Sequence, residues 1–379
     1  MILFYLQLLI TLIVNILIIP FFLLYKCYLV PEWIHNKFIK YIIIFNGPVF
    51  IKYVQLLLID KEALREHISN DLINELTNLE DKIYKPIKLN NKITINNENL
   101  NIENSYSISS GTISSVYEFS YNNKDYILKK VHKNVVQNIK RGYILLKIIL
   151  TKFPFISKYK KFCKLVDIKN FENVLLKQCD MHYESGALQQ FYRLFKTSLI
   201  INTPKYVFNT QNILIMQKLD GYKLDDFIKL YPNKKLETYC LLTSTVYTMI
   251  KYKFLHGDFH FGNMFFDIKN DTVVINIFDF GIVFNLSDEQ SKNLLDYIET
   301  QQTDKLVCFL KTINPNIPTD YKQLYSRRID SIDIDLIKNY HIPLEIINLL
   351  SIFQNISLFF TKNNLNDLID YMIANDIMD

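Results

Sequence analysis

The pattern of hydrophobic positions is most distinctive at the beginning of the chain. Residues 2–25 carry no charged side chain. A helix of that length, which rises about 1.5 Å per residue, is long enough to cross a hydrocarbon core of about 30 Å. The run has no basic region before it and no small-residue cleavage site after it, so it favours an uncleaved transmembrane anchor over a signal peptide. A buried or interfacial helix is the alternative, because Gln7, Asn15 and Pro20 interrupt the run.

Basic residues next to this run indicate its orientation. Lys26, Lys37 and Lys40 follow the apolar segment, whereas no basic residue precedes it. Since positive charge stays on the cytoplasmic side of a membrane, we expect a single-pass protein whose C-terminal bulk faces the cytoplasm. A second apolar stretch, residues 41–58, is broken by Asn-Gly-Pro at 46–48 and predicts an amphipathic helix, either soluble or at a membrane surface.

The periodicity of the remaining chain predicts a mixture of helices and strands. Residues 90–105 are rich in asparagine and are expected to be a polar connecting segment that contains a domain boundary. Alternation over residues 106–131, with Asn122-Asn123-Lys124 between two runs, predicts a hairpin. Helical spacing is expected over 60–89, 138–200 and most of the remainder, with short strands at 212–220, around 264–266 and at 273–278.

Composition narrows the class of protein. The chain has 379 residues, of which 49% are hydrophobic and 21% charged, and this balance excludes a disordered or collagen-like chain. The net charge of +5 is dispersed among acidic residues, which argues against nucleic acid as a partner. Five widely separated cysteines without a Cys-x-x-Cys pair disfavour both a disulfide framework and a zinc site. Glycine is scarce, at 8 residues, so the remaining glycines are informative.

The strongest candidate chemistry lies in HGDFHFGN, residues 256–263, and in the DFG that follows at 279–281. Phosphoryl transfer needs a carboxylate to orient or deprotonate the attacking hydroxyl, and Asp258 provides one. It also needs oxygen ligands for Mg²⁺, which Asn263 and Asp279 provide on either side of a predicted hairpin. Either motif alone could be an ordinary turn, but both together in this order indicate kinase-type catalysis with ATP and Mg²⁺.

Kinase chemistry also requires a strand lysine, a helix glutamate and a loop that covers the phosphates. Strand alternation favours Lys130 over Lys129 as the phosphate-binding lysine, although the alternation alone does not separate the two. Glu184, on the same face of a predicted helix as Asp180, is the candidate partner of Lys130. The remaining candidates are the small residues Ser109, Ser110, Gly111 and Thr112, expected to approach phosphate oxygens, and Gln217, Lys218 and Leu219, expected to form a hinge beside adenine.

With these motifs, the chain resembles the UbiB/ADCK family of atypical, protein-kinase-like proteins associated with coenzyme Q. The family's Lys-x-Gly-Gln signature is similar to GPVFIKYVQ, residues 47–55, in which Lys52 and Gln55 match. The resemblance implies that Lys52 and Gln55 face the nucleotide, and it implies a lipid or isoprenoid-like ligand. Val54, Gln178 and Phe261 depart from the family pattern, as does the serine-rich loop, which puts the family's exclusion of peptide substrates in doubt.

Together these features predict an α+β, bilobal, protein-kinase-like fold with an N-terminal helical extension and an N-terminal transmembrane helix. The expected divisions are an anchor (1–25), the helical extension (26–100), an N-lobe with a helical insert (101–220) and a C-lobe with a helical tail (221–379). The expected function is that of a membrane-anchored atypical kinase or ATPase. Two alternatives stay open: a small-molecule phosphotransferase resembling aminoglycoside and choline kinases, and a nucleotide-binding pseudokinase scaffold.

Overall fold

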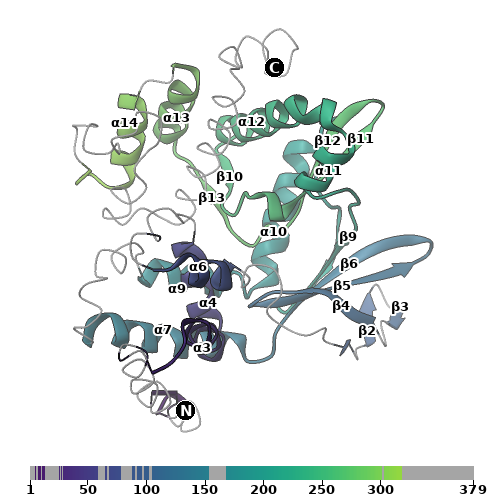
Figure 1. The fold of residues 1–379 in the computed structure, drawn as a ribbon. Coiled ribbons are helices and arrows are strands. Elements are labelled where there is room, and N and C mark those ends of the chain that lie inside the picture. The colour runs from purple at the N-terminus through teal and green to yellow at the C-terminus, as the bar shows by residue number, and fades with distance from the viewer. Residues whose placement is uncertain are drawn as a thin grey trace. The chain divides into compact units, whose positions relative to one another are not determined.

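The computed structural model describes residues 29–58, 68–77, 88–89, 92–95, 98–101, 105–152, 168–300 and 303–317, together with residues 5, 7–9, 11–12, 25, 27 and 65. The chain forms two compact units, and their helices and strands are labelled in Figure 1. The first unit comprises residues 1–164, 168–180 and 211–213, and the second comprises the rest. The four divisions expected from the sequence stay predictions.

The first unit begins with helices that bury a common apolar core. Helix α3 bends into α4 at Gly47, whose φ of 86° lies in the left-handed region that glycine tolerates best. Buried Ile43, Ile51 and Ile73 come from three different helices and join in one cluster. The helices of this unit are α3 (Glu32–Asn46), α4 (Pro48–Leu57), α6 (Asn70–Thr77), α7 (Val135–Lys152) and α9 (Ile168–Lys177).

The first unit also contains an antiparallel sheet in which β1, β4, β5 and β6 follow one another as neighbours. The turn between β5 and β6 is Asn122-Asn123, with φ of 50° and 58°, as expected of a two-residue hairpin loop with positive φ at both positions. This confirms the hairpin predicted from the sequence. The strands are β1 (Lys88–Leu89), β4 (Ser105–Ser110), β5 (Ser114–Tyr121) and β6 (Lys124–Val131).

The prediction that residues 90–105 form only a polar connecting segment was wrong. Strand β2 (Lys92–Ile95) pairs antiparallel with β3 (Glu98–Asn101) in a separate hairpin. Within β2, Ile93 and Ile95 alternate with polar residues, and Leu100 lies opposite Ile93. The alternation that drives strand formation is therefore present despite the asparagine-rich composition.

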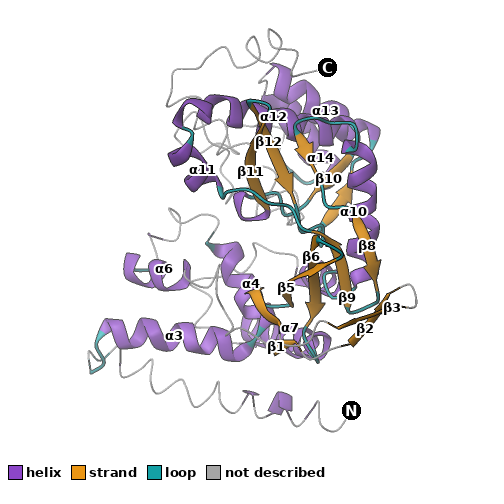
Figure 2. Cartoon of the chain, turned by 90° about the vertical axis from the view of Figure 1, so that its right-hand side faces the viewer, coloured by secondary structure: helices purple, strands orange, loops and turns teal. Residues whose placement is uncertain are grey.

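The second unit contains two small sheets, β10–β13 and β11–β12–β7, together with the paired strands β8 and β9 and several helices. Figure 2 shows these strands and helices. Strand β8 pairs with β9, β10 pairs with β13, and β12 pairs antiparallel with β11 and parallel with β7. The strands are β7 (Ile201–Asn202), β8 (Tyr206–Asn209), β9 (Ile213–Gln217), β10 (Phe254–His256), β11 (Met264–Lys269), β12 (Thr272–Ile277) and β13 (Val283–Asn285). The helices are α10 (Met181–Phe195), α11 (Leu224–Leu230), α12 (Lys235–Lys251), α13 (Asp288–Thr300), α14 (Thr303–Ile313) and the 3₁₀ turns η2 (Pro232–Lys234) and η3 (Phe261–Asn263).

Several expectations for these elements are confirmed and others are corrected. The strands expected at 212–220, around 264–266 and at 273–278 correspond to β9, β11 and β12. Strands β7, β8, β10 and β13 were missed, because runs of two to four residues are too short to establish a period. Helix α10 begins at Met181, so Asp180 precedes it and does not share a helical face with Glu184.

Most of the expected membrane anchor, residues 2–25, lies outside the described residues. Of the described ones, Gln7 accepts a hydrogen bond from Arg141 of α7 at 3.1 Å, and the ring of Tyr25 stacks on His35 of α3. Among the helices that the structure describes, none has the length and apolar character needed to span a bilayer.

Candidate functional site

The site in the second unit is built around a loop that leaves β10. Strand β10 pairs with β13 and places His256 opposite Val283. The next backbone N–H, that of Gly257, donates to the carbonyl of Ile282 at 2.9 Å. The chain between β10 and η3 is thus held to the segment that precedes β13, and Asp258 projects from that loop.

His256 is a buried link between the two motifs predicted from the sequence. Its side chain is 1% exposed and lies among the rings of Phe191, Phe259 and Phe280. The backbone N–H of Asp258 donates to Nδ1 of His256 at 3.2 Å, so this nitrogen is an acceptor and Nε2 carries the proton. Nε2 lies 3.3 Å from the carbonyl oxygen of Phe278, which accepts from it.

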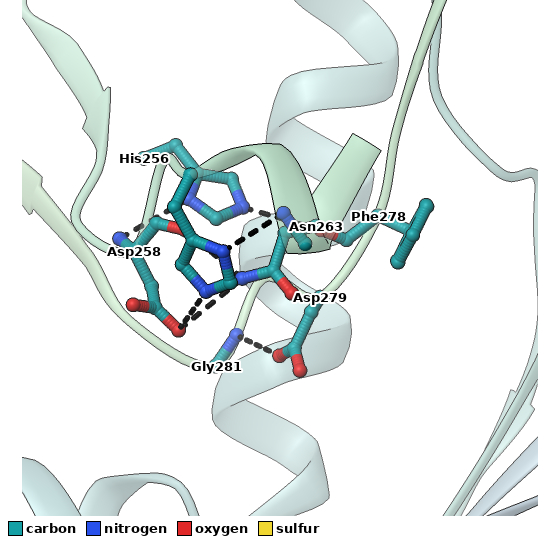
Figure 3. Close-up of polar contacts among 8 residues, drawn as sticks. His256, Asp258, Asn263, Phe278, Asp279 and Gly281 are labelled. Carbon is teal, nitrogen blue, oxygen red and sulfur yellow. Dashed lines mark hydrogen bonds and ion pairs between the residues drawn. The ribbon is translucent and has the colours of Figure 1, made fainter. Parts of the chain in front are cut away.

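The pKa of His256 is lowered, first by burial, and the neighbouring carboxylates of Asp258 and Asp279 oppose that effect without reversing it. The neutral imidazole is also the form that the hydrogen bonds require, since a proton on Nδ1 would face the N–H of Asp258. His256 therefore acts as a fixed spacer between the loop of Asp258 and the residue before Asp279 (Figure 3).

Asn263 lies between the two predicted carboxylates, as Figure 3 shows. Its side-chain Nδ2 donates to the backbone carbonyl of Asp258 at 2.9 Å and to Oδ2 of Asp258 at 3.2 Å. Because the amide nitrogen is turned toward Asp258, the amide oxygen Oδ1 points away from it. The backbone carbonyl of Asn263 accepts from the N–H of Phe278 at 3.1 Å, which holds this loop against the approach to Asp279.

The hairpin β11–β12 brings Asn263 and Asp279 together from positions separated in the sequence. Met264 and Ile277 form the last pair of the hairpin, so the residues beyond each end emerge side by side. Asp279 has a φ of 64°, a conformation that is uncommon for residues other than glycine and is enriched at functional sites. Its Oδ1 accepts from the N–H of Gly281 at 3.3 Å, which helps to orient the carboxylate.

His260 forms the opposite flank of Asp258. Its Nε2 is 3.6 Å from Oδ2 of Asp258, and its Nδ1 accepts from the N–H of Gly262 at 3.0 Å. The ring covers Gly262 so closely that a Cβ added there would lie 2.6 Å from Cε1 of His260. Both histidines belong to the HGDFHFGN motif, but no role was predicted for either from the sequence. Their position on either side of Asp258 was the available signal.

The donor atoms in this cluster fit Mg²⁺. The amide oxygen of Asn263 and the carboxylate of Asp279 are hard oxygen ligands, and Mg²⁺ typically uses one or two such protein ligands together with phosphate oxygens and water. Within the described part of the chain there is no group of three or more His, Cys, Asp or Glu residues that could hold a metal.

Glu184 belongs to the same unit but to another element. It lies in the first turn of α10 and is 1% exposed. The hydroxyl of Tyr183 donates to the carbonyl of Val283 at 3.0 Å, which joins this turn to β13, the strand that pairs with β10. A carboxylate buried to this degree needs a cation or hydrogen-bond donors, which suits the predicted partner of a lysine.

The predicted phosphate-binding residues lie in the first unit. The register between β5 and β6 places Lys130 opposite Ser115, whose hydroxyl is 2.8 Å from that of Ser110 on β4. Lys130 thus shares a polar row with Ser110, and burial lowers its pKa. Lys129, the alternative, is opposite Val116 on the other face and is the more buried of the two lysines.

Of the four residues predicted as a loop, Ser109 and Ser110 are the last residues of β4, and only Gly111 and Thr112 lie in the tight connection to β5. The N–H of Gly111 donates to the carbonyl of Ser114 at 3.0 Å, and Nε2 of His132 is 3.0 Å from the carbonyl oxygen of Gly111. Ser109 and Gly111 are exposed, whereas Ser110 and Thr112 are buried. Ser109 and Gly111 are therefore accessible to solvent. The contact of His132 with Gly111 was not predicted from the sequence.

Lys52 and Gln55 lie three residues apart on α4, and both are half-buried. The helix that carries them is held by α7, where a Cβ at Gly142 would lie 3.0 Å from Cβ of Val49. The position of α4 thus depends on a glycine outside the predicted motifs.

The predicted hinge follows β9 in the second unit. The N–H of Gln217 donates to the carbonyl of Lys205 at 2.9 Å, and Leu219 is half-buried. Lys218 pairs with Asp220 at 3.3 Å. The amide of buried Asn276 donates to the carbonyl of Asp220 at 2.6 Å, so the predicted hinge is connected to β12.

The structure thus brings Asp258, Asn263 and Asp279 into one cluster, with Glu184 elsewhere in the same unit. It places Lys130, the loop of Ser109 to Thr112, and Lys52 with Gln55 in the other unit. Their convergence on one nucleotide stays a prediction.

Comparison with known proteins gives a consistent result. The description "ABC1 atypical kinase-like domain" matches residues 95–305. The chain is 27% identical over 169 residues to the "Probable serine/threonine-protein kinase abkC" of Dictyostelium discoideum, covering 43% of this chain and 24% of that protein. It is 27% identical over 243 residues to the "Probable protein kinase UbiB" of Blochmanniella pennsylvanica, covering 59% of this chain and 43% of that protein. The chain thus spans less than half the length of these two relatives.

Among solved structures, the chain is similar to that titled "The complex structure of Rv3197-erythromycin from Mycobacterium tuberculosis", with a TM-score of 0.40 and 15% identity over 73% of this chain and 70% of that chain. The family match is the stronger result, because it covers more than half of this chain and includes Asp258, Asn263 and Asp279. It confirms the predicted kinase-like α+β fold and the resemblance drawn from the motifs. The chain belongs to the ABC1 atypical kinase-like family, which is the UbiB/ADCK family.

Proposed function

We propose that this chain is a Mg²⁺-dependent enzyme that uses ATP, either as a phosphotransferase or as an ATPase of the UbiB/ADCK type. The observation that carries the proposal is the cluster in which Asn263 holds Asp258 through two hydrogen bonds and lies beside Asp279. Family membership supports the same reaction class, since the curated relatives are named probable protein kinases.

Each residue of the cluster has a distinct part in the proposed chemistry. The carboxylate of Asp258 orients an attacking hydroxyl and accepts its proton, and the amide of Asn263 keeps that carboxylate in place. The oxygens of Asn263 and Asp279 would hold Mg²⁺, which neutralises phosphate charge when it is bound. His256 keeps the two motifs in register, because it contacts the backbone on both sides.

The remaining predicted site residues are proposed to hold the nucleotide itself. Lys130, braced by Glu184, would contact the phosphates, and Ser109, Ser110, Gly111 and Thr112 would cover them with backbone N–H groups. Gln217, Lys218 and Leu219 would lie beside adenine, and Lys52 and Gln55 would face the nucleotide from α4. The polar row of Lys130, Ser115 and Ser110 supports the choice of Lys130 over Lys129.

The proposal includes attachment to a membrane through residues 2–25, with the kinase-like portion on the cytoplasmic side. The uncharged sequence of that segment and the lysines that follow it support this orientation. A lipid or isoprenoid-like molecule is the proposed acceptor or ligand, since an enzyme held at a bilayer meets such molecules at high local concentration.

Thermal unfolding of the full chain tests the nucleotide site. A ligand that binds the native state alone raises the melting temperature, so Mg-ATP should raise it, whereas Mg²⁺ with adenosine should raise it much less. If millimolar Mg-ATP leaves the melting temperature unchanged, both enzyme hypotheses and the nucleotide-binding scaffold hypothesis would be excluded.

Turnover separates the remaining functions. Asp258→Asn should abolish phosphate release or transfer while retaining the Mg-ATP shift, because the nucleotide ligands are unchanged. Turnover that persists in this variant would exclude Asp258 as the base. Binding without turnover in the unaltered chain would support a pseudokinase scaffold. Screening lipid, aminoglycoside, choline and protein acceptors would distinguish the UbiB-type function from a small-molecule phosphotransferase.

A further inference from the structure

Helix α3 has a buried face and an exposed face, and both carry large apolar side chains. The buried face contributes Ile43 to the core shared with α4 and α6, with Ile39 packed against it. Figure 2 shows α3 as the long helix below α6. On the other face the rings of Trp33, Tyr41 and Phe45 are 63%, 67% and 52% exposed. The described residues of the first unit therefore cover only one face of α3.

The exposed residues form a regular stripe. Trp33, Lys37, Tyr41 and Phe45 follow one another at intervals of four residues, and we refer to these four residues as the aromatic stripe. Residues four apart are neighbours on a helix surface, so the stripe is continuous. Nζ of Lys37 lies 5.4 Å from the centre of the Trp33 ring, within the range of a cation–π interaction. Leu29, just before the helix, extends the apolar surface and is 70% exposed.

The composition of the stripe matches the interface of a bilayer. Tryptophan and tyrosine are enriched at the headgroup level of membranes, where an apolar ring and a polar tip are both satisfied. A lysine among them can extend its ammonium toward anionic headgroups while its methylene chain stays on apolar surface. A second protein copy would suit an apolar stripe less well with Lys37 at its centre, since charged residues are depleted in the core of such interfaces.

The sequence next to α3 also favours a bilayer as the partner of this surface. The uncharged residues 2–25 end only seven residues before Glu32, the first residue of the helix. Lys26 lies between the two segments, and Lys40 follows on α3, where it also pairs with Glu75 at 3.1 Å. Tyr25, the last residue of the uncharged segment, stacks on His35 of α3 with ring centroids 3.7 Å apart, so the end of the proposed anchor lies beside this helix.

We propose that the aromatic stripe of α3 lies in the headgroup region of a bilayer and fixes the orientation of the first unit on the membrane. The proposal rests on the membrane attachment proposed above and adds a second, surface contact to it. Because α4 packs with α3 in one core, this contact also sets the orientation of the helix that carries Lys52 and Gln55.

The chain provides its own probe of this surface, because Trp33 is its single tryptophan. The full chain would be reconstituted in vesicles of phosphatidylcholine and phosphatidylglycerol, with bromine placed on the acyl chains at increasing depth. Fluorescence is excited at the red edge of the absorption, so that the tyrosines do not contribute. We expect bromine near the headgroups to quench Trp33 strongly, and bromine near the chain ends to quench it much less.

Matched substitutions distinguish the stripe from other apolar surface. The double variant Tyr41→Asp with Phe45→Asp should lose most of the quenching, because two charged side chains replace the rings that enter the interface. Leu199→Asp is the control, since Leu199 is 89% exposed in the second unit, and quenching in this variant should be unchanged. Both changes replace exposed side chains, and an unchanged melting temperature would show that the variants fold.

The outcomes also separate this proposal from the proposed anchor. A chain that sediments with vesicles but whose Trp33 escapes quenching would overturn the stripe contact and leave the anchor standing. A chain that does not sediment would overturn both. An emission shift that depends on protein concentration, without dependence on bromine, would assign the stripe to contact with a second copy.

Discussion

The glycine at the end of the predicted hinge should be one of the least replaceable residues in the second unit. Gly221 has a φ of 143°, and a Cβ built there would lie 2.9 Å from Cβ of Phe265 and 2.9 Å from the carbonyl oxygen of Phe266. The adjacent residue, Tyr222, exchanges two backbone hydrogen bonds with Phe266, of 2.9 and 2.8 Å. Gly221→Ala must therefore either strain its own backbone or separate the hinge from β11.

The size of the effect follows from that geometry. A side chain in such a conformation costs about 1–3 kcal/mol. The backbone oxygen of Phe266 cannot move aside without weakening the bridge to Tyr222. For a unit of this size each kcal/mol shifts the melting temperature by about 2–4 °C. The expected loss for Gly221→Ala is therefore roughly 2–12 °C.

Gly186 provides a control of opposite sign. It lies inside α10 and is exposed, and a Cβ added there meets no atom within 4 Å. Replacing a glycine inside a helix with alanine stabilises by about 0.5–1 kcal/mol, so Gly186→Ala should raise the melting temperature by roughly 1–4 °C. The two variants would be compared by calorimetry of the full chain. Equal shifts of the same sign would refute the close approach of the hinge to β11.

Three further predictions concern buried contacts. The free energy of unfolding should fall as the pH drops below about 6.5, because His256 stays neutral in the folded state and becomes protonated in the unfolded chain; urea titrations should show a smaller fall for His256→Gln. Asn276→Leu should lower the free energy of unfolding by about 1–3 kcal/mol, because it removes the donor to Asp220 and the acceptor of Asn202, and a value near zero in denaturant titration would contradict this. Gly142→Ala should lower it by about 1–3 kcal/mol through crowding against Val49, and rescue by Val49→Ala in a double-mutant cycle would confirm the contact.

The sequence was most informative where local chemistry decides the structure. The hairpin around Asn122-Asn123 was predictable because alternation and residues that tolerate positive φ coincide there. The proximity of Asn263 to the segment of Asp279 was predictable because a short hairpin brings its two ends together. Strand alternation places Lys129 and Lys130 on opposite faces of the sheet, but the choice of Lys130 as the phosphate-binding lysine stays a prediction.

Other features depend on contacts that no local pattern encodes. The requirement for glycine at position 142 exists only because α4 approaches α7 at Val49. The spacer function of His256 arises from the rings that bury it and from the carbonyl of Phe278. Its place in the motif was visible, but its burial was not. Helix α10 excludes Asp180, because helix boundaries depend on caps and packing more than on spacing.

The most direct test of the central claim is a calorimetric titration of ATP into the full chain, with and without Mg²⁺, and again with Asp279→Ala. If Asn263 and Asp279 hold the metal beside the phosphates, Mg²⁺ should tighten ATP binding, and Asp279→Ala should lose most of that gain while still folding. ATP affinity that is the same with and without Mg²⁺, or a gain from Mg²⁺ that Asp279→Ala leaves intact, would contradict the proposed magnesium–nucleotide site.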